Sequence, residues 1–163
     1  MAKYFMGIDA GTGSVRVAIF DEKGHMTAYD VKEYPSYYPK SGWAEQNDRD
    51  WWNALKEAIP ACIRKSGVKP EEIVGISCDG TSSTTIFLDK DGKSVRTPIL
   101  WMDVRASEEA QSISELAKDC DALKFYRSGV PAESLIPKCM WVKKNEPENW
   151  DKTVTIFEFT SWL

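Results

Sequence analysis

One stretch decides the fold of this 163-residue chain: Tyr4-Phe5-Met6-Gly7-Ile8-Asp9-Ala10-Gly11-Thr12-Gly13-Ser14-Val15-Arg16-Val17-Ala18-Ile19-Phe20. The apolar run Tyr4–Asp9 ends at a glycine-rich turn, and Val15–Phe20 resumes with β-branched residues. Two strands joined by a tight turn are therefore predicted. Turn-forming residues at Asp21–Gly24 precede a third extended run, His25–Tyr34, so we expect an antiparallel three-stranded meander.

The turn Asp9–Ser14 combines a carboxylate at the end of a strand with two glycines and two hydroxyls. Glycines let backbone N–H groups approach phosphate oxygens, Thr12 and Ser14 can donate hydrogen bonds, and Asp9 can hold Mg²⁺ directly or through water. Arg16 can add a guanidinium to the same phosphates. Because a strand follows the turn, the motif is neither a P-loop nor a Rossmann fingerprint. The alternative is an ordinary hairpin turn.

A helix is predicted after the loop Pro35–Asn47, which is rich in proline, glycine and aromatic residues. Asn47 is a suitable N-cap, and apolar side chains follow at helical spacing up to a stop at Gly67. These side chains are Trp51, Leu55, Ile59, Cys62 and Ile63. Pro60 lies inside the pattern, so we expect it to kink the helix or end it early.

The rest of the chain adds strands and helices in an order typical of an α/β protein with a mixed sheet. Ile73–Cys78 is a continuous apolar run, which predicts a buried central strand, and Thr84–Leu88 predicts a strand that leads into the turn Asp89–Gly92. Ala106–Ala117 and Lys138–Lys144 predict helices. No repeat, low-complexity segment or linker interrupts the chain, so we expect one continuous domain.

Two further segments carry side chains suited to a polyhydroxylated ligand. Asp79 and Thr81 follow the predicted buried strand, where open α/β sheets bind ligands, although a polar loop is the alternative. Trp101, Asp103 and Arg105 combine an aromatic surface for the apolar face of a sugar with charged groups for its hydroxyls. The alternative places Trp101 in the core, with Asp103 capping the next helix and pairing with Arg105.

Composition argues against several kinds of partner. The net charge is -4 and the pI is near 5.1, so the chain lacks the basic field that nucleic-acid binding needs, and no run of like charge suggests a membrane patch. No apolar stretch reaches the length of about eighteen residues that a spanning helix needs, and no signal sequence is evident, so we expect a cytoplasmic protein. Four scattered cysteines and one histidine indicate neither a zinc site nor a disulfide framework.

Taken together, the motifs resemble the FGGY carbohydrate kinases in their order and approximate spacing. The matching segments are Asp9–Ser14 with Arg16, Gly42–Asn47, Gly75–Thr81, Leu100–Ala106 and Pro137–Trp141. The pattern Asp79-x-Thr81 and the block Trp101-Met102-Asp103-x-Arg105 look most like the ribulokinase-type pentulose kinases. Glycerol kinases carry Arg-Glu near positions 80 and 81, and xylulose kinases carry Met-His there; this chain has neither pair.

The resemblance implies an actin-like, ribonuclease H-like ATPase domain of the hexokinase–Hsp70–actin superfamily. It implies an ATP-dependent sugar kinase that moves the γ-phosphoryl group of Mg-ATP to a hydroxyl of a pentulose, hexulose or related polyol. The residues implied to bind the cofactor are Asp9, Gly11, Thr12, Gly13, Ser14 and Arg16, with Asp9 organising Mg²⁺. The residues implied to line the sugar pocket are Asp79, Thr81, Trp101 and Asp103, with Arg105 either touching the substrate or bracing Asp103.

The resemblance also implies that much of the enzyme lies elsewhere. FGGY kinases run to roughly three times this length, which fits two actin-like domains, and their catalytic base and adenine-binding segment lie beyond Leu163. The apolar, uncapped end Val154–Leu163 suggests a cut fragment, so we expect residues 1–163 to be a truncated, inactive first domain prone to self-association into a homo-oligomer. A phosphate- or sugar-binding module without catalysis is the alternative, and a regulatory or scaffold protein is a third.

Overall fold

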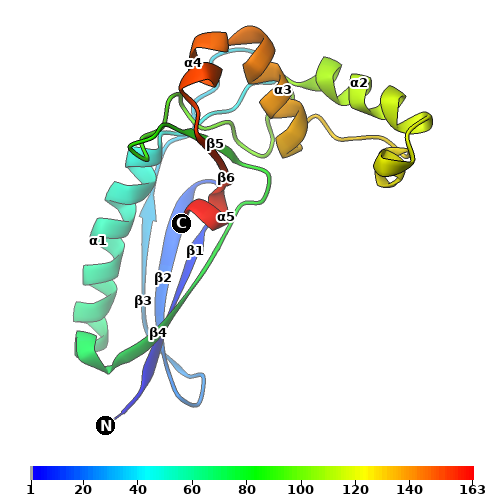
Figure 1. The fold of residues 1–163 in the computed structure, drawn as a ribbon. Helices are drawn as coiled ribbons and strands as arrows, with labels where there is room; N and C mark the ends of the chain where they lie inside the picture. The colour runs from blue at the N-terminus through cyan, green and yellow to red at the C-terminus, as the bar shows by residue number, and fades with distance from the viewer. Residues whose placement is uncertain (1) are drawn as a thin grey trace. The chain divides into compact units, whose positions relative to one another are not determined.

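The computed structural model describes residues 2–163 and groups them into two compact units. Unit 1 comprises the residues up to Ser36, Asn47–Thr81 and Leu163, and unit 2 comprises Tyr37–Gln46 and Ser82–Trp162. Each unit has its own sheet (Figure 1). We expected one continuous domain because no linker is visible in the sequence, and the boundary between the two units falls within the polar segment Asp79–Thr84.

Unit 1 is built on a four-stranded sheet in the order β3-β2-β1-β4. Its strands are β1 (Tyr4–Ala10), β2 (Ser14–Asp21), β3 (Met26–Glu33) and β4 (Ile73–Gly80). β1 pairs antiparallel with β2, and β2 pairs antiparallel with β3, which confirms the predicted meander. β4 pairs parallel with β1, so the carboxyl ends of these two strands meet at the same edge of the sheet.

Helix α1 (Asp48–Ser66) packs on β2 and β3 through the face that carries Trp51, Leu55 and Cys62. The predicted cap is confirmed, because the Asn47 side chain accepts a hydrogen bond from the backbone N–H of Arg49 at 3.0 Å. Gly67 ends the helix in a left-handed conformation, with φ of 67°. The helix continues through Pro60 to Ser66, so the early end that the proline suggested does not occur, since burial of this face offsets the lost backbone hydrogen bond.

The prediction of a buried central strand at Ile73–Cys78 is wrong for this chain. Within residues 2–163, β4 pairs with β1 alone and forms an edge of the sheet, and a 3-10 turn at Pro70–Glu72 leads into it. Val74 is 53% exposed and Ile76 is 64% exposed. A continuous apolar run shows which side chains are suited to burial, but burial also needs elements that cover both faces.

Unit 2 contains a two-stranded antiparallel sheet and several short helices. Its elements are β5 (Thr85–Leu88), α2 (Ser107–Lys118), the 3-10 helix η2 (Asp121–Tyr126), α3 (Leu135–Asn145), α4 (Pro147–Lys152), β6 (Thr155–Glu158) and α5 (Phe159–Trp162). The predicted strand and both predicted helices are confirmed, although α3 begins earlier than expected, at Leu135.

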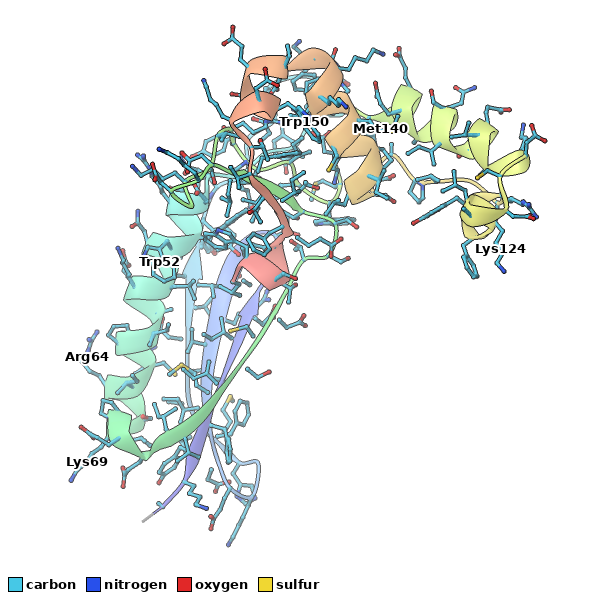
Figure 2. The ribbon with its side chains drawn as sticks, in the orientation of Figure 1. Trp52, Arg64, Lys69, Lys124, Met140 and Trp150 are labelled. Carbon is cyan, nitrogen blue, oxygen red and sulfur yellow. The ribbon has the colours of Figure 1, made fainter. Side chains whose placement is uncertain are left out.

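The core of unit 2 is formed by Phe87, Ile99 and Val142, with Trp150 of α4 packed against it (Figure 2). Strand β6 was not predicted as a separate element, and it pairs with β5 from Thr155 to Glu158. Within the part of the chain that the structure describes, no helix combines the length and the apolar character that a membrane span requires.

Candidate functional site

The glycine-rich turn of unit 1 joins β1 to β2 and is held by backbone and side-chain hydrogen bonds. The backbone N–H of Gly11 donates to the carbonyl of Ser14 at 3.0 Å. Tyr34, directly after β3, donates its hydroxyl to the carbonyl of Gly11 at 2.5 Å and its backbone N–H to the carbonyl of Gly13 at 3.2 Å. Burial and the nearby Asp9 carboxylate raise the pKa of Tyr34, so its hydroxyl stays protonated and keeps donating.

The outer side of the turn leaves room for a ligand to approach the backbone. A Cβ atom added at Gly13 would meet no heavy atom within 4 Å, whereas one added at Gly11 would contact Nη1 of Arg16 at 3.4 Å and the carbonyl oxygen of Ser14 at 3.7 Å, so the open space lies at Gly13. Open space beside a glycine backbone is what a phosphate needs in order to reach backbone N–H groups. Thr12 and Ser14 lie on the same turn and complete the set of polar groups predicted for the cofactor.

A row of charged side chains crosses the sheet beside this turn. Asp9 on β1 lies opposite Arg16 on β2 and opposite Asp79 on β4, so the three side chains share one face of the sheet. Nη1 of Arg16 lies 2.9 Å from Oδ2 of Asp9, and about half of each side chain is exposed. The sequence placed Asp79 in a separate motif, and the parallel pairing of β1 and β4 brings it next to Asp9.

The Asp9 carboxylate and the polar groups of the glycine-rich turn fit Mg²⁺ bound together with a polyphosphate. Mg²⁺ is usually held by one or two carboxylates while water and phosphate oxygens fill its other positions. Asp9 is a carboxylate open to solvent beside the turn, which suits that arrangement. Among residues 2–163, no group of three or more His, Cys, Asp and Glu side chains could form an all-protein metal cage.

In unit 2, Asp103 is fully buried and both of its carboxylate oxygens accept hydrogen bonds. Oδ2 accepts from the backbone N–H of Ala44 at 2.6 Å and from Nη2 of Arg105 at 2.7 Å. Oδ1 accepts from the backbone N–H and from Nε of Arg105, each at 2.9 Å. Asp103 therefore pairs with Arg105, but no side chain caps the N-terminus of α2, whose N-cap residue is Ala106.

Arg105 extends this pair into a network that sequence reasoning missed. Its Nη2 lies 2.8 Å from Oε1 of Glu45, which also contacts Nη2 of Arg96 at 2.6 Å. The Arg105 guanidinium lies 3.9 Å from the ring centroid of Trp43 and 5.1 Å from that of Trp141. Trp43 and Glu45 lie in the Gly42–Asn47 segment. The sequence showed that this segment resembles the family pattern, but it indicated no role for either residue.

Trp101 differs from its two neighbours in the motif because its side chain faces solvent. Trp101 is 43% exposed, so the alternative that placed it in the core does not hold. Its backbone N–H donates to Oγ1 of Thr84 at 3.1 Å. The structure thus brings Trp101, Asp103 and Arg105 together in unit 2, whereas Asp79 and Thr81 belong to unit 1 with the glycine-rich turn.

Comparison with known proteins places the chain in a family. Residues 4–163 match the N-terminal domain of the FGGY family of carbohydrate kinases. The chain therefore belongs to the FGGY family.

Its relatives include a xylulose kinase from Bacillus subtilis, 34% identical over 93% of this chain and 30% of the relative. A glycerol kinase from Roseiflexus is 36% identical over 90% of this chain and 30% of the relative. The crystal structure of a "xyloylose kinase" from Brucella ovis matches with a TM-score of 0.85 and 26% identity, covering 98% of this chain and 33% of that one.

These matches confirm the predicted fold class, a mixed sheet with helices as in the actin-like FGGY kinases. The chain spans about 30% of the length of the curated relatives that it matches. The relatives named above are a xylulose and a glycerol kinase, and the finer resemblance to ribulokinase-type enzymes stays a prediction.

Proposed function

We propose that residues 1–163 form the N-terminal portion of the first actin-like domain of an ATP-dependent carbohydrate kinase. This enzyme would transfer the γ-phosphoryl group of Mg-ATP to a hydroxyl of a pentulose, hexulose or related polyol. Membership of the FGGY family supports the proposal. The structural observation that carries it is the row Arg16–Asp9–Asp79 beside a glycine-rich turn, because it places side chains suited to phosphate, to a metal ion and to sugar hydroxyls next to one another at one edge of the sheet.

Each group of the turn has a defined task in this proposal. ATP supplies the phosphoryl group, and the Mg²⁺ bound to ATP neutralises part of the negative charge of the phosphates. The backbone N–H of Gly13 and the hydroxyls of Thr12 and Ser14 hold phosphate oxygens, while Arg16 compensates their charge and Asp9 holds Mg²⁺. Gly11 closes the turn through its own N–H bond to the Ser14 carbonyl. Phosphoryl transfer demands mainly positioning and electrostatic stabilisation from the protein, and these groups supply both.

The sugar side of the proposal rests on Asp79, Thr81 and Trp101. A carboxylate and a hydroxyl can bind sugar hydroxyls, and the exposed indole of Trp101 suits the apolar face of a sugar ring. Because Asp103 is fully buried and paired with Arg105, we propose that these two residues brace the segment around Trp101. The general base that accepts the proton of the sugar hydroxyl, and the adenine site, would lie outside residues 1–163. A cytoplasmic location and homo-oligomer formation stay predictions.

The test uses the full-length protein with Mg-ATP and a panel of pentuloses, hexuloses, glycerol and other polyols, and it follows ADP release. Sugar-dependent release of ADP is expected with at least one member. Release with none of them, despite measurable sugar or phosphate binding, would replace the proposal with a non-catalytic binding module.

The variant Asp9→Asn connects the activity to the turn. We expect it to lower kcat by at least about a hundredfold while sugar binding stays intact, since Asp9 acts on the metal and the phosphates. The matched control is Glu57→Gln, because Glu57 forms a similarly exposed ion pair with Lys32 at 3.5 Å on the same unit. Equal losses in both variants, or loss of sugar binding in Asp9→Asn, would point to a folding role.

A further inference from the structure

Lys138 on α3 is a buried cation that the proposed function does not use. The residue is 0% exposed, and its Nζ donates to the carbonyl of Ser83 at 2.7 Å and to the carbonyl of Leu100 at 2.8 Å. A buried ammonium is costly unless its hydrogen bonds are satisfied. Two carbonyls, both distant from Lys138 in sequence, accept hydrogen bonds from two of its three N–H donors here.

The electrostatic surroundings of Lys138 keep a positive charge tolerable at this place. Burial lowers the pKa of Lys138 to about 8, and the positive charge of Arg105 acts in the same direction. The carboxylates of Asp103, Glu133 and Glu158 oppose this shift in the pKa of Lys138 by attracting the charged form. The ammonium is therefore retained at neutral pH between the two carbonyls.

Both carbonyls belong to segments that hold Trp101. Leu100 directly precedes Trp101, and it is fully buried. Ser83 directly precedes Thr84, whose Oγ1 accepts the backbone N–H of Trp101 at 3.1 Å. Ser83 also has φ of 60°, a left-handed conformation that a non-glycine residue adopts only when its surroundings enforce it. Lys138 thus binds the residue before Trp101 in the chain, and it also binds the residue before Thr84, whose hydroxyl holds the backbone N–H of Trp101.

We propose that Lys138 is a positioning residue for Trp101. By holding the carbonyls of Leu100 and Ser83, it fixes the buried backbone from which the exposed indole projects, so that the ring is held ready for the apolar face of the sugar. The inference rests on the proposed function, since it deepens the role given there to Trp101. An apolar side chain of similar length would fill the same space but remove the stronger donor from each carbonyl. The Leu100 carbonyl would keep only the backbone N–H of Asp103 at 3.1 Å, and the Ser83 carbonyl only Oγ1 of Thr85 at 3.3 Å.

The test is a double-mutant cycle in the full-length enzyme with Lys138→Met and Trp101→Ala. Each single variant is expected to raise the KM for sugar about tenfold, while the KM for ATP stays unchanged. The double variant is expected to show about the same tenfold increase, because Lys138 acts through Trp101. The matched control is Lys144→Met, on the same helix and exposed, which should leave both KM values unchanged. All assays are run below the melting midpoint of every variant.

Two results would overturn the inference. One is a sugar KM unchanged by Lys138→Met although Trp101→Ala raises it, and the other is a double variant whose effects multiply to about a hundredfold. If Lys138→Met does not fold, Lys138→Gln carries the test, because its amide can still donate to one carbonyl.

A second readout separates this inference from the proposed function. In protein labelled with fluorotryptophan, the ¹⁹F resonance of Trp101, assigned by its loss in Trp101→Phe, is expected to shift or broaden in Lys138→Met and not in Lys144→Met. If the spectral change occurs but the protein has no kinase activity, the proposed function is wrong and the positioning role of Lys138 still holds. An unchanged Trp101 resonance would overturn the positioning role whatever the activity.

Discussion

Replacing Asp103 with asparagine should test whether the carboxylate acts on the fold or on the sugar. The side chain is fully buried, and it accepts hydrogen bonds from the backbone of Ala44 and from three donors of Arg105. Asparagine has nearly the same shape but places an NH₂ group against one set of these donors and removes the negative charge. Because breaking a buried ion pair costs about 3–5 kcal/mol, we expect a loss of that size in the free energy of unfolding.

The measurement is urea unfolding of the full-length protein, followed by tryptophan fluorescence. The fluorescence is a suitable probe because the Arg105 guanidinium stacks on the ring of Trp43. The matched control is Glu108→Gln, whose side chain is 84% exposed and pairs with the exposed Lys144. An exposed pair contributes less than about 1 kcal/mol, so the control should unfold at nearly the urea concentration of the wild type.

One outcome would refute the reasoning from burial. Asp103→Asn would then unfold like the control Glu108→Gln while its KM for sugar rises about tenfold or more. That combination would mean that the carboxylate contacts the sugar directly. The expected outcome is the reverse, a large loss of stability with sugar KM changed only as far as the segment around Trp101 is loosened.

Three further predictions concern single contacts in the two units. Tyr34→Phe removes the hydrogen bond to the glycine-rich turn, so the full-length protein should lose about 1–2 kcal/mol of stability and show a higher KM for ATP; a wild-type Tm and KM would contradict it. Gly42→Ala places a Cβ 2.9 Å from Cγ2 of Val104 at φ of 76°, so Tm should fall by more than in Gly24→Ala, where φ is 82° but nothing lies within 4 Å. Equal falls would show that crowding at Gly42 is relieved without cost. Because the pKa of Lys138 is lowered to about 8 from an ordinary 10.5, the unfolded chain binds this proton more tightly, and the group makes stability rise between pH 8 and 10.5. The free energy of unfolding of the wild type minus that of Lys138→Met should therefore increase by up to about 3 kcal/mol over this window, and a difference that stays flat with pH would contradict the pKa shift.

The elements that the sequence predicted correctly are marked by local sequence patterns, each only a few residues long. The meander follows from apolar runs separated by Gly11, Gly13 and Gly24, and α1 follows from its cap and its 3.6-residue period. Nearest neighbours along the chain generate these features, so no knowledge of the tertiary structure is needed. The same holds for the position of the turn between β1 and β2.

Several features could not be read from the sequence because they depend on distant partners. The pairing of β5 with β6 joins segments separated by most of unit 2. The exposure of Val74 and Ile76 depends on what covers β4, and the apolar run itself carries no information about that. The buried pair of Asp103 and Arg105 could not be predicted as part of a larger network for the same reason. Glu45 and Trp43, which contact Arg105, lie about sixty residues earlier in the sequence.

The sequence by itself determined the local elements, the glycine-rich turn and the family pattern, since each is encoded by residue types at short, regular spacing. The tertiary structure decided that Asp79 stands beside Asp9, that Asp103 is buried while Trp101 is exposed, and that Lys138 holds Leu100. Strand pairing, burial and hydrogen bonding between remote segments arise only when the chain has folded, because they are properties of neighbours in space.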